Sequence, residues 1–138
     1  MSAQNAVVER RIADLEASDT LLATNDTGRT LYHNEIITIA AGTNKGMVGI
    51  VDSGSVGGTV AANAQYNLIH KGIFEVPAAA ASFTLGCDVQ YVPSAASVTT
   101  GATATGTYGM GKCVLTAASS AGYVKVDLNS GPTAFYVW

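Results

Sequence analysis

Charged side chains are scarce in this sequence: Asp, Glu, Lys and Arg together make up 12% of the 138 residues, and the formal net charge is -3. This share is about half of what globular domains usually carry. The sequence therefore lacks the basic footprint of a nucleic-acid-binding protein. It indicates instead a surface of small, neutral side chains, which suits a protein that is partly covered by neighbours in a larger assembly.

Long apolar runs are also absent. No run approaches the ~20 residues that a membrane-spanning helix needs, so no membrane partner is expected. Residues 1–18 carry charges where a signal peptide would have its apolar core. We therefore expect a protein that is made and kept in the cytosol.

Cysteine is rare, with only Cys87 and Cys113 in the chain. In a reducing compartment both remain thiols. Each falls in a strand-like segment, which favours a buried, small apolar role; a disulfide and a reactive thiol are the alternatives. The two cysteines and two distant histidines, His33 and His70, give no spacing typical of a zinc site, and no metal is expected.

Catalytic and cofactor motifs are missing as well. The sequence has no G-x-S-x-G nucleophile elbow, no phosphate-binding loop and no dinucleotide-binding fingerprint. Asp52–Ser55 begins like a calcium loop, but the acidic residues that calcium requires do not follow, so a simple turn is expected. The sequence gives no reason to place a nucleophile and an orienting carboxylate beside either histidine. We therefore expect no enzymatic activity and no cofactor.

Four scattered carboxylates are expected to be solvated rather than catalytic. Each stands beside apolar neighbours in a strand-like segment, which predicts the wet face of a sheet instead of an acid–base pair. They are Glu35, Glu75, Asp88 and Asp127. The dispersed, Tyr-rich aromatics have no basic residues interleaved with them, so single-stranded nucleic acid is not an expected partner either.

The N-terminal residues predict an arm. Val8, Ile12 and Leu15 recur at i, i+4 and i+7, which favours a short helix over residues 5–17 with one narrow apolar stripe. A helix this short is marginal on its own in water, so the stripe should dock on something. The next residues, rich in Asn, Asp, Thr and Gly, favour an extended connector. We therefore predict an N-terminal helical and extended arm over residues 1–30.

Residues 31–130 predict an all-β domain. Short β-prone segments recur at roughly 8–12-residue spacing between turn-like stretches, which favours a small barrel or sandwich. In Tyr123–Leu128 the apolar residues alternate with Lys125 and Asp127, so one face should be core and the other wet. Glycines inside Tyr108–Cys113 indicate a β-bulge or a close backbone approach.

Residues 131–138 form a dense aromatic tail. It contains Phe135, Tyr136 and Trp138, the last being the only Trp of the chain. Chain ends usually fray in water, so such an apolar end needs a partner surface. Two alternatives remain open: a final strand packed on its own domain, or insertion into a neighbouring subunit or another protein.

Four segments follow one another in a specific order: GMVGIVDSG (46–54), KGIFEVP (71–77), LGCDVQYVPSAASVTT (85–100) and YGMGKCVLTAASSAGYVKVDL (108–128). Their order and spacing resemble the capsid cement, or decoration, proteins of tailed bacteriophages, long filed as a domain of unknown function. Gly72–Val76 is similar to the family's Gly-Val/Ile-Phe-Glu-Leu/Val segment, and Val124–Leu128 to its closing Val-x-Val-x-Leu strand. The resemblance covers about Gly46 to Leu128; many members lack the arm and the aromatic tail.

The resemblance implies a protein that assembles in the host cytoplasm and ends on the outer surface of the virion. Its partners would be the major capsid protein and two further copies of itself, because such proteins usually act as homotrimers at three-fold and quasi-three-fold positions. There they stabilise the expanded capsid against the pressure of packed DNA. Our hypothesis is that the arm and the tail supply the contacts with neighbours. The proposed contact residues are Val8, Ile12, Leu15, Phe135, Tyr136 and Trp138.

Two other functions are weighed against decoration. One is a carbohydrate- or receptor-binding β-module of a phage fibre or adhesin, which an exposed aromatic platform with nearby carboxamides would favour. The other is a minor capsid or head–tail joining component. A stable trimer in solution would support decoration, whereas a monomer with glycan affinity would support the adhesin.

Overall fold

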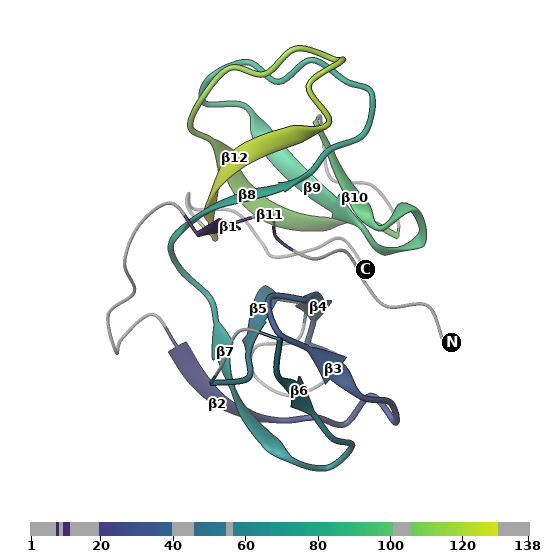
Figure 1. Cartoon of the computed structure of the whole chain (residues 1–138). Helices are drawn as coiled ribbons and strands as arrows, with labels where there is room; N and C mark the ends of the chain where they lie inside the picture. The colour runs from purple at the N-terminus through teal and green to yellow at the C-terminus, as the bar shows by residue number, and fades with distance from the viewer. Residues whose placement is uncertain are drawn as a thin grey trace.

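The computed structural model of the chain describes residues 8, 10–11, 20–39, 46–54, 57–100 and 106–129. Over this part the protein is all-β, and its one helical element is a single 3-10 turn, η2, at Pro93–Ala95. The strands form two lobes, one above the other (Figure 1). The all-β prediction is therefore confirmed.

The lower lobe contains a four-stranded antiparallel sheet in the order β2-β7-β5-β4 and a two-stranded sheet of β3 and β6. Its strands are β2 (Thr20–Thr24), β3 (Leu31–Tyr32), β4 (Ile36–Thr38), β5 (Val48–Asp52), β6 (Thr59–Val60) and β7 (Gln65–Ile69). These sheets enclose a core of their own, formed by Leu31, Ile37, Val51, Val60, Tyr66 and Leu68.

The upper lobe is a six-stranded sheet in the order β1-β8-β12-β11-β9-β10. Its strands are β1 (Arg10–Arg11), β8 (Ile73–Pro77), β9 (Asp88–Val92), β10 (Ser97–Thr100), β11 (Tyr108–Cys113) and β12 (Tyr123–Leu128). One parallel bridge, Ala78 to Val98, brings β10 back towards the end of β8. Pairing between these edges goes no further in the described residues, so the fold is sandwich-like and not a closed barrel.

One hydrophobic cluster joins the two lobes. From the lower lobe it takes Ile36, Val48, Ile50 and Ile69, and from the upper lobe Phe74, Val76, Val89, Tyr91, Val98, Met110, Val124, Val126 and Leu128, among others. Burying a side chain of this size contributes about 1.5–3 kcal/mol. The alternation predicted for Tyr123–Leu128 is confirmed, because Val124, Val126 and Leu128 are buried while Lys125 and Asp127 are partly exposed.

The glycines of β11 produce the predicted bulge. The register between β11 and β9 shifts between Gly109 and Gly111. A Cβ atom built on Gly111 would lie 2.0 Å from the carbonyl oxygen of Asp127, which no side chain tolerates. Both parts of the prediction, a bulge and a close backbone approach, are confirmed at this site.

The described N-terminal residues differ from the predicted helix and connector. β1 is extended and pairs antiparallel with β8, so residues 5–17 are not a continuous helix. The following segment is extended at β2, as predicted, but it is more than a connector, because all five residues of β2 pair with β7. The physical reason is that strand pairing joins residues far apart in sequence, and local periodicity does not report it.

Candidate interaction surface

One polar cluster, at the end of β5, resembles part of a catalytic triad. His33 Nδ1 accepts the backbone N–H of Ser53 at 3.2 Å, and Ser53 Oγ lies 3.1 Å from the same nitrogen. The nearest carboxylate oxygen of Asp52 is 3.8 Å from it as well. A catalytic triad needs the nucleophile and the carboxylate on opposite ring nitrogens. The cluster therefore ties a loop to a strand end, and these contacts do not have the geometry of a catalytic triad.

Glu35 is buried completely, which corrects the prediction that it lies on a solvated face. Its carboxylate forms an ion pair with Arg29 through two contacts, one of them from Nη1 to Oε1 at 3.2 Å. The backbone N–H of Tyr32 also donates to Oε1 at 3.0 Å. The hydrogen bond with this carboxylate raises the pKa of Arg29 above its ordinary value. Three donors thus offset the cost of burying the charge.

The other three carboxylates are at least partly exposed, as predicted. Asp88 is exposed and forms an ion pair with Lys112 across β9 and β11, whereas Glu75 and Asp127 are partly exposed. Among the described residues, no group of three or more His, Cys, Asp and Glu side chains is placed to hold a metal ion. No helix in the described part of the chain is long and apolar enough to cross a membrane.

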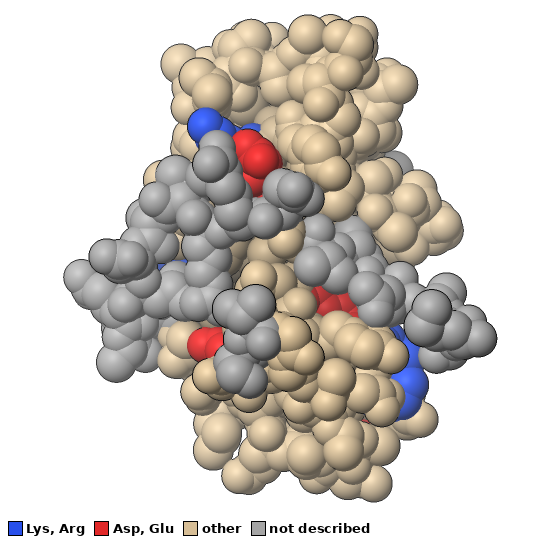
Figure 2. Space-filling view, viewed as in Figure 1, with Lys and Arg blue, Asp and Glu red and all other residues tan. Residues whose placement is uncertain are grey.

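Three large apolar side chains stand in solvent on the upper lobe, and we call them the apolar tip. Leu85 is 64% exposed, Leu115 55% and Tyr123 42%. Leu85 and Leu115 lie on the loops 78–87 and 114–122, neither of which contains a charged residue. Figure 2 shows the upper end of this lobe without charged side chains on the face in view. The tip is therefore suited to a partner surface that is neutral and apolar.

The loops of the apolar tip are held against each other by hydrogen bonds. Phe83 and Ala117 exchange two backbone hydrogen bonds of 2.8 Å, and the Phe83 side chain is 1% exposed. The Leu85 N–H donates to Thr116 Oγ1 at 3.1 Å. Because Phe83 is anchored in the core, the neighbouring Leu85 is presented outward on a fixed backbone. A mobile loop would pay more ordering entropy on binding.

A hollow of about 280 Å³ adjoins the tip. Its lining includes the tip residues Leu115 and Tyr123 and two charged residues, Glu75 and Lys125. The remaining lining residues are small or apolar: Thr116, Ala117, Ala118, Ala121 and Val124. A protruding side chain of a partner would fit such a hollow beside the exposed leucines, as interface anchors commonly do.

The structure places one of the predicted contact residues. Val8 is 3% exposed, belongs to the core shared by the two lobes, and donates its N–H to the carbonyl oxygen of Asn34 at 2.9 Å. The predictions for Ile12, Leu15, Phe135, Tyr136 and Trp138 lie outside the described residues.

Sequence reasoning did not single out the leucines of the tip. The available signal was a pair of leucines within stretches made only of Ala, Ser, Thr, Gly and other uncharged residues. That signal becomes informative only when the two stretches are known to be neighbouring loops.

An all-β domain with a neutral apolar tip is typical of a structural or binding module. The family model described as "Phage cement protein" matches residues 16–128. The chain therefore belongs to the phage cement protein family, as its motifs indicated, and is a structural, capsid-associated component of the phage particle. None of the curated proteins and none of the solved structures compared with the chain matches it.

Proposed function

We propose that this chain is a decoration protein that binds the outer surface of the expanded phage head as a homotrimer, at three-fold and quasi-three-fold positions. There it clamps adjoining major capsid proteins and stabilises the shell against internal pressure. The observation that carries the proposal is the family match over residues 16–128. The neutral apolar tip supports it, because a cement protein must offer its partner a surface that needs little desolvation.

The energetics favour a trimer over a single copy. Once one subunit of a trimer is attached, the second and third contacts are effectively intramolecular, so weak individual contacts give a stable attachment. A protein that binds only the expanded lattice also stabilises that state by mass action. The stabilisation per head then grows with the number of trimers bound.

We assign two kinds of contact to this attachment. The first is the apolar tip, which meets a neutral, apolar patch of the major capsid protein. The second is formed by the chain ends: Ile12 and Leu15 of the arm, and Phe135, Tyr136 and Trp138 of the tail, reach the capsid or a sister subunit. Aromatic anchors usually carry most of the binding energy of an interface. Val8, buried in its own chain, anchors the start of the arm.

The test mixes the purified protein with undecorated, expanded heads and images them by electron cryo-microscopy. We expect trimeric density on the outside of the head at three-fold positions, and a trimeric native mass for the bound species. Density confined to a portal vertex would indicate a head–tail component instead. A monomer that ignores heads and binds glycans would support an adhesin and overturn the proposal.

A variant pair tests the tail. Trp138→Ala should weaken head binding at least about tenfold, as expected for an aromatic anchor, while the far-ultraviolet circular dichroism of the β-domain stays the same. The matched control is Leu22→Ala, which removes a side chain that is 69% exposed on the lower lobe. Unchanged affinity of the Trp138→Ala protein would show that the tail is not a docking element.

A further inference from the structure

The two cysteines of the chain lie opposite each other on neighbouring segments of the upper lobe. Lys112 pairs with Asp88 across β11 and β9, and the next residues along are Cys113 and Cys87. The Cys113 N–H donates to the Cys87 carbonyl oxygen at 2.9 Å, and the Gly86 N–H donates to the Cys113 carbonyl oxygen at 2.8 Å. The two backbones are therefore fixed side by side at this point.

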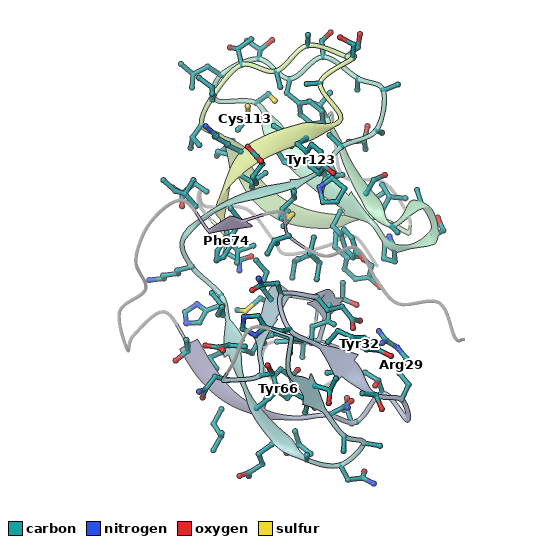
Figure 3. The ribbon with its side chains drawn as sticks, viewed as in Figure 1. Arg29, Tyr32, Tyr66, Phe74, Cys113 and Tyr123 are labelled. Atoms are coloured by element: carbon teal, nitrogen blue, oxygen red, sulfur yellow. The ribbon has the colours of Figure 1, made fainter. Side chains whose placement is uncertain are left out.

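The thiols themselves also meet. The Cys87 thiol is close enough to the Cys113 thiol to contribute to raising its pKa, and Figure 3 shows two sulfur atoms close together at the Cys113 label. Cys87 and Cys113 are cross-strand neighbours joined by one backbone hydrogen bond; neighbours of this kind have Cβ atoms about 4.5–5.5 Å apart, and disulfides need about 3.5–4.5 Å. Bridging the two sulfurs therefore requires only a small adjustment of the backbone.

We propose that Cys87 and Cys113 form a thiol pair that closes into a cross-strand disulfide when the protein leaves a reducing compartment. The oxidant is a low-molecular-weight disulfide such as oxidised glutathione. The Cys87 thiolate attacks one sulfur of this disulfide, which forms a mixed disulfide and expels one small thiolate. The Cys113 thiolate then attacks the Cys87 sulfur and expels the second small thiolate. The two protons released by the protein thiols go to the two expelled thiolates.

The surroundings of the sulfurs set this order of attack. Cys87 is partly exposed, whereas Cys113 is buried and its thiol donates to the Leu115 carbonyl oxygen at 3.0 Å. Burial raises the pKa of the Cys113 thiol, which keeps its thiolate scarce. The second step nevertheless proceeds because the attacking sulfur is already in place. In a reducing cytosol, glutathione and thioredoxin systems keep both thiols reduced.

The disulfide would lie at the base of the apolar tip. Cys87 ends the loop that carries Leu85, and Cys113, the last residue of β11, directly precedes the loop that carries Leu115. Closing the bridge covalently joins two loops that only noncovalent contacts hold together in the reduced protein. This effect on the tip depends on the proposed function, whereas the thiol chemistry does not.

The test of the chemistry uses the isolated full-length protein. Incubation with oxidised glutathione should reduce the free-thiol count from two to zero, lower the mass by two hydrogen atoms, and yield one cross-linked peptide that contains both cysteines. The cross-link should raise Tm by roughly 5–10 °C, and a reductant should reverse the rise. Two persisting thiols, or a stable glutathione adduct without the cross-link, would overturn the proposal.

Single-cysteine variants provide the matched controls. Cys87→Ser changes the more exposed partner, so the protein should fold and show no oxidant-dependent change in Tm. Cys113→Ser should stop at a glutathione adduct on Cys87. If the buried position does not tolerate Ser, Cys113→Ala retains an apolar side chain there and gives the same measurement. An oxidant-dependent Tm rise in a single-cysteine variant would exclude the cross-link as its cause.

Oxidised and reduced protein are then compared on the same expanded heads. Slower dissociation of the oxidised form, by several-fold, is expected if the cross-link fixes the tip. Equal dissociation rates would overturn the effect on the tip, while the thiol count decides the disulfide itself. Failure of both forms to bind heads would count against the proposed function and leave the thiol chemistry as measured.

Discussion

At the scale of single residues, the lower lobe depends on a charge that is buried among apolar side chains. Glu35 is the only carboxylate among the buried residues of the described chain, and Arg29 is its ionic partner. The position of Arg29, labelled in Figure 3, is at the edge of this lobe. Removing one member of a buried ion pair leaves the other charge uncompensated, which costs far more than the pair itself contributes.

We therefore expect Arg29→Ala to lower the free energy of unfolding by about 3 kcal/mol. Urea-induced unfolding followed by circular dichroism measures the change. The matched control is Lys112→Ala, which breaks the more exposed pair with Asp88 and should cost less than about 1 kcal/mol. Similar losses in both variants would show that burial of Glu35 does not set the cost.

Tyr66 makes the folding stability of the lower lobe depend on pH. Burial raises the pKa of its phenol to about 12, from an ordinary value of 10.0, with further contributions from Asp26 and Glu35. Because the folded state favours the neutral phenol, this contribution to stability is complete below pH 10 and is lost as the pH rises to about 12. We expect a late tyrosinate absorbance step accompanied by loss of stability. Tyr66→Phe should lack that step, and its persistence in the variant would assign it to another residue.

At the scale of the strands, the β11 bulge is set by Gly111. Any side chain there would collide with the backbone of Asp127 on β12. We expect Gly111→Ala to destabilise the protein by about 3 kcal/mol, as measured by chemical denaturation. Gly122→Ala is the matched control: its φ is also positive, at +79°, but nothing lies within 4 Å of the added atom. That control should cost only about 1 kcal/mol, from backbone strain.

Asn129, which directly follows β12, connects the lobes. Its side-chain N–H groups donate to the carbonyl oxygens of Val48 at 3.0 Å and His70 at 2.8 Å. Its backbone N–H donates to the carbonyl oxygen of Met110 at 2.6 Å. Its φ of 55° is in the left-handed region, so glycine preserves the backbone.

We expect Asn129→Gly to lower the unfolding free energy by about 2 kcal/mol, since two partly buried carbonyl oxygens lose a hydrogen-bond donor. Asn63→Gly, at an exposed residue with a φ of 68°, should be close to neutral. Calorimetry compares the two. Equal Tm values would mean that the amide of Asn129 contributes nothing to the connection between the lobes.

Much of the upper lobe could be predicted from local sequence. The alternation of Val124, Val126 and Leu128 reports strand and face directly, and the glycines of β11 report the bulge. The helix predicted over residues 5–17 was wrong at Arg10–Arg11, because Val8, Ile12 and Leu15 fit a helical period by spacing alone. The pairing of β1 with β8 depends on residues more than sixty positions away, which local periodicity does not contain.

The same distinction applies to the candidate sites. The burial of Glu35 could not be read from its apolar neighbours, because it depends on how Arg29 folds back towards it. The apolar tip required knowledge that two neutral loops meet. The family, in contrast, followed from the order of short motifs, since that order is a property of the sequence itself.

At the scale of the whole molecule, low charge determines how attachment should respond to salt. The loops that carry Leu85 and Leu115 contain no charged residue, and the chain has a net charge of only -3. Salt screens charge–charge attraction and leaves apolar contacts intact. We expect the dissociation constant for expanded heads to change less than about threefold between roughly 0.1 M and 0.5 M NaCl. A tenfold weakening would place the main contact on charged residues elsewhere.

The shared hydrophobic cluster makes the two lobes one mechanical body. Side chains from β4, β5 and β7 interlock with those of β8 to β12, so a load applied at one end of the molecule is carried to the other through close-packed atoms. The described part of the chain should therefore behave as one rigid unit and not as two independently moving lobes. Under a pulling force it should unfold in a single step. If such rigid units are bound across a capsid, they would resist its outward deformation without deforming themselves.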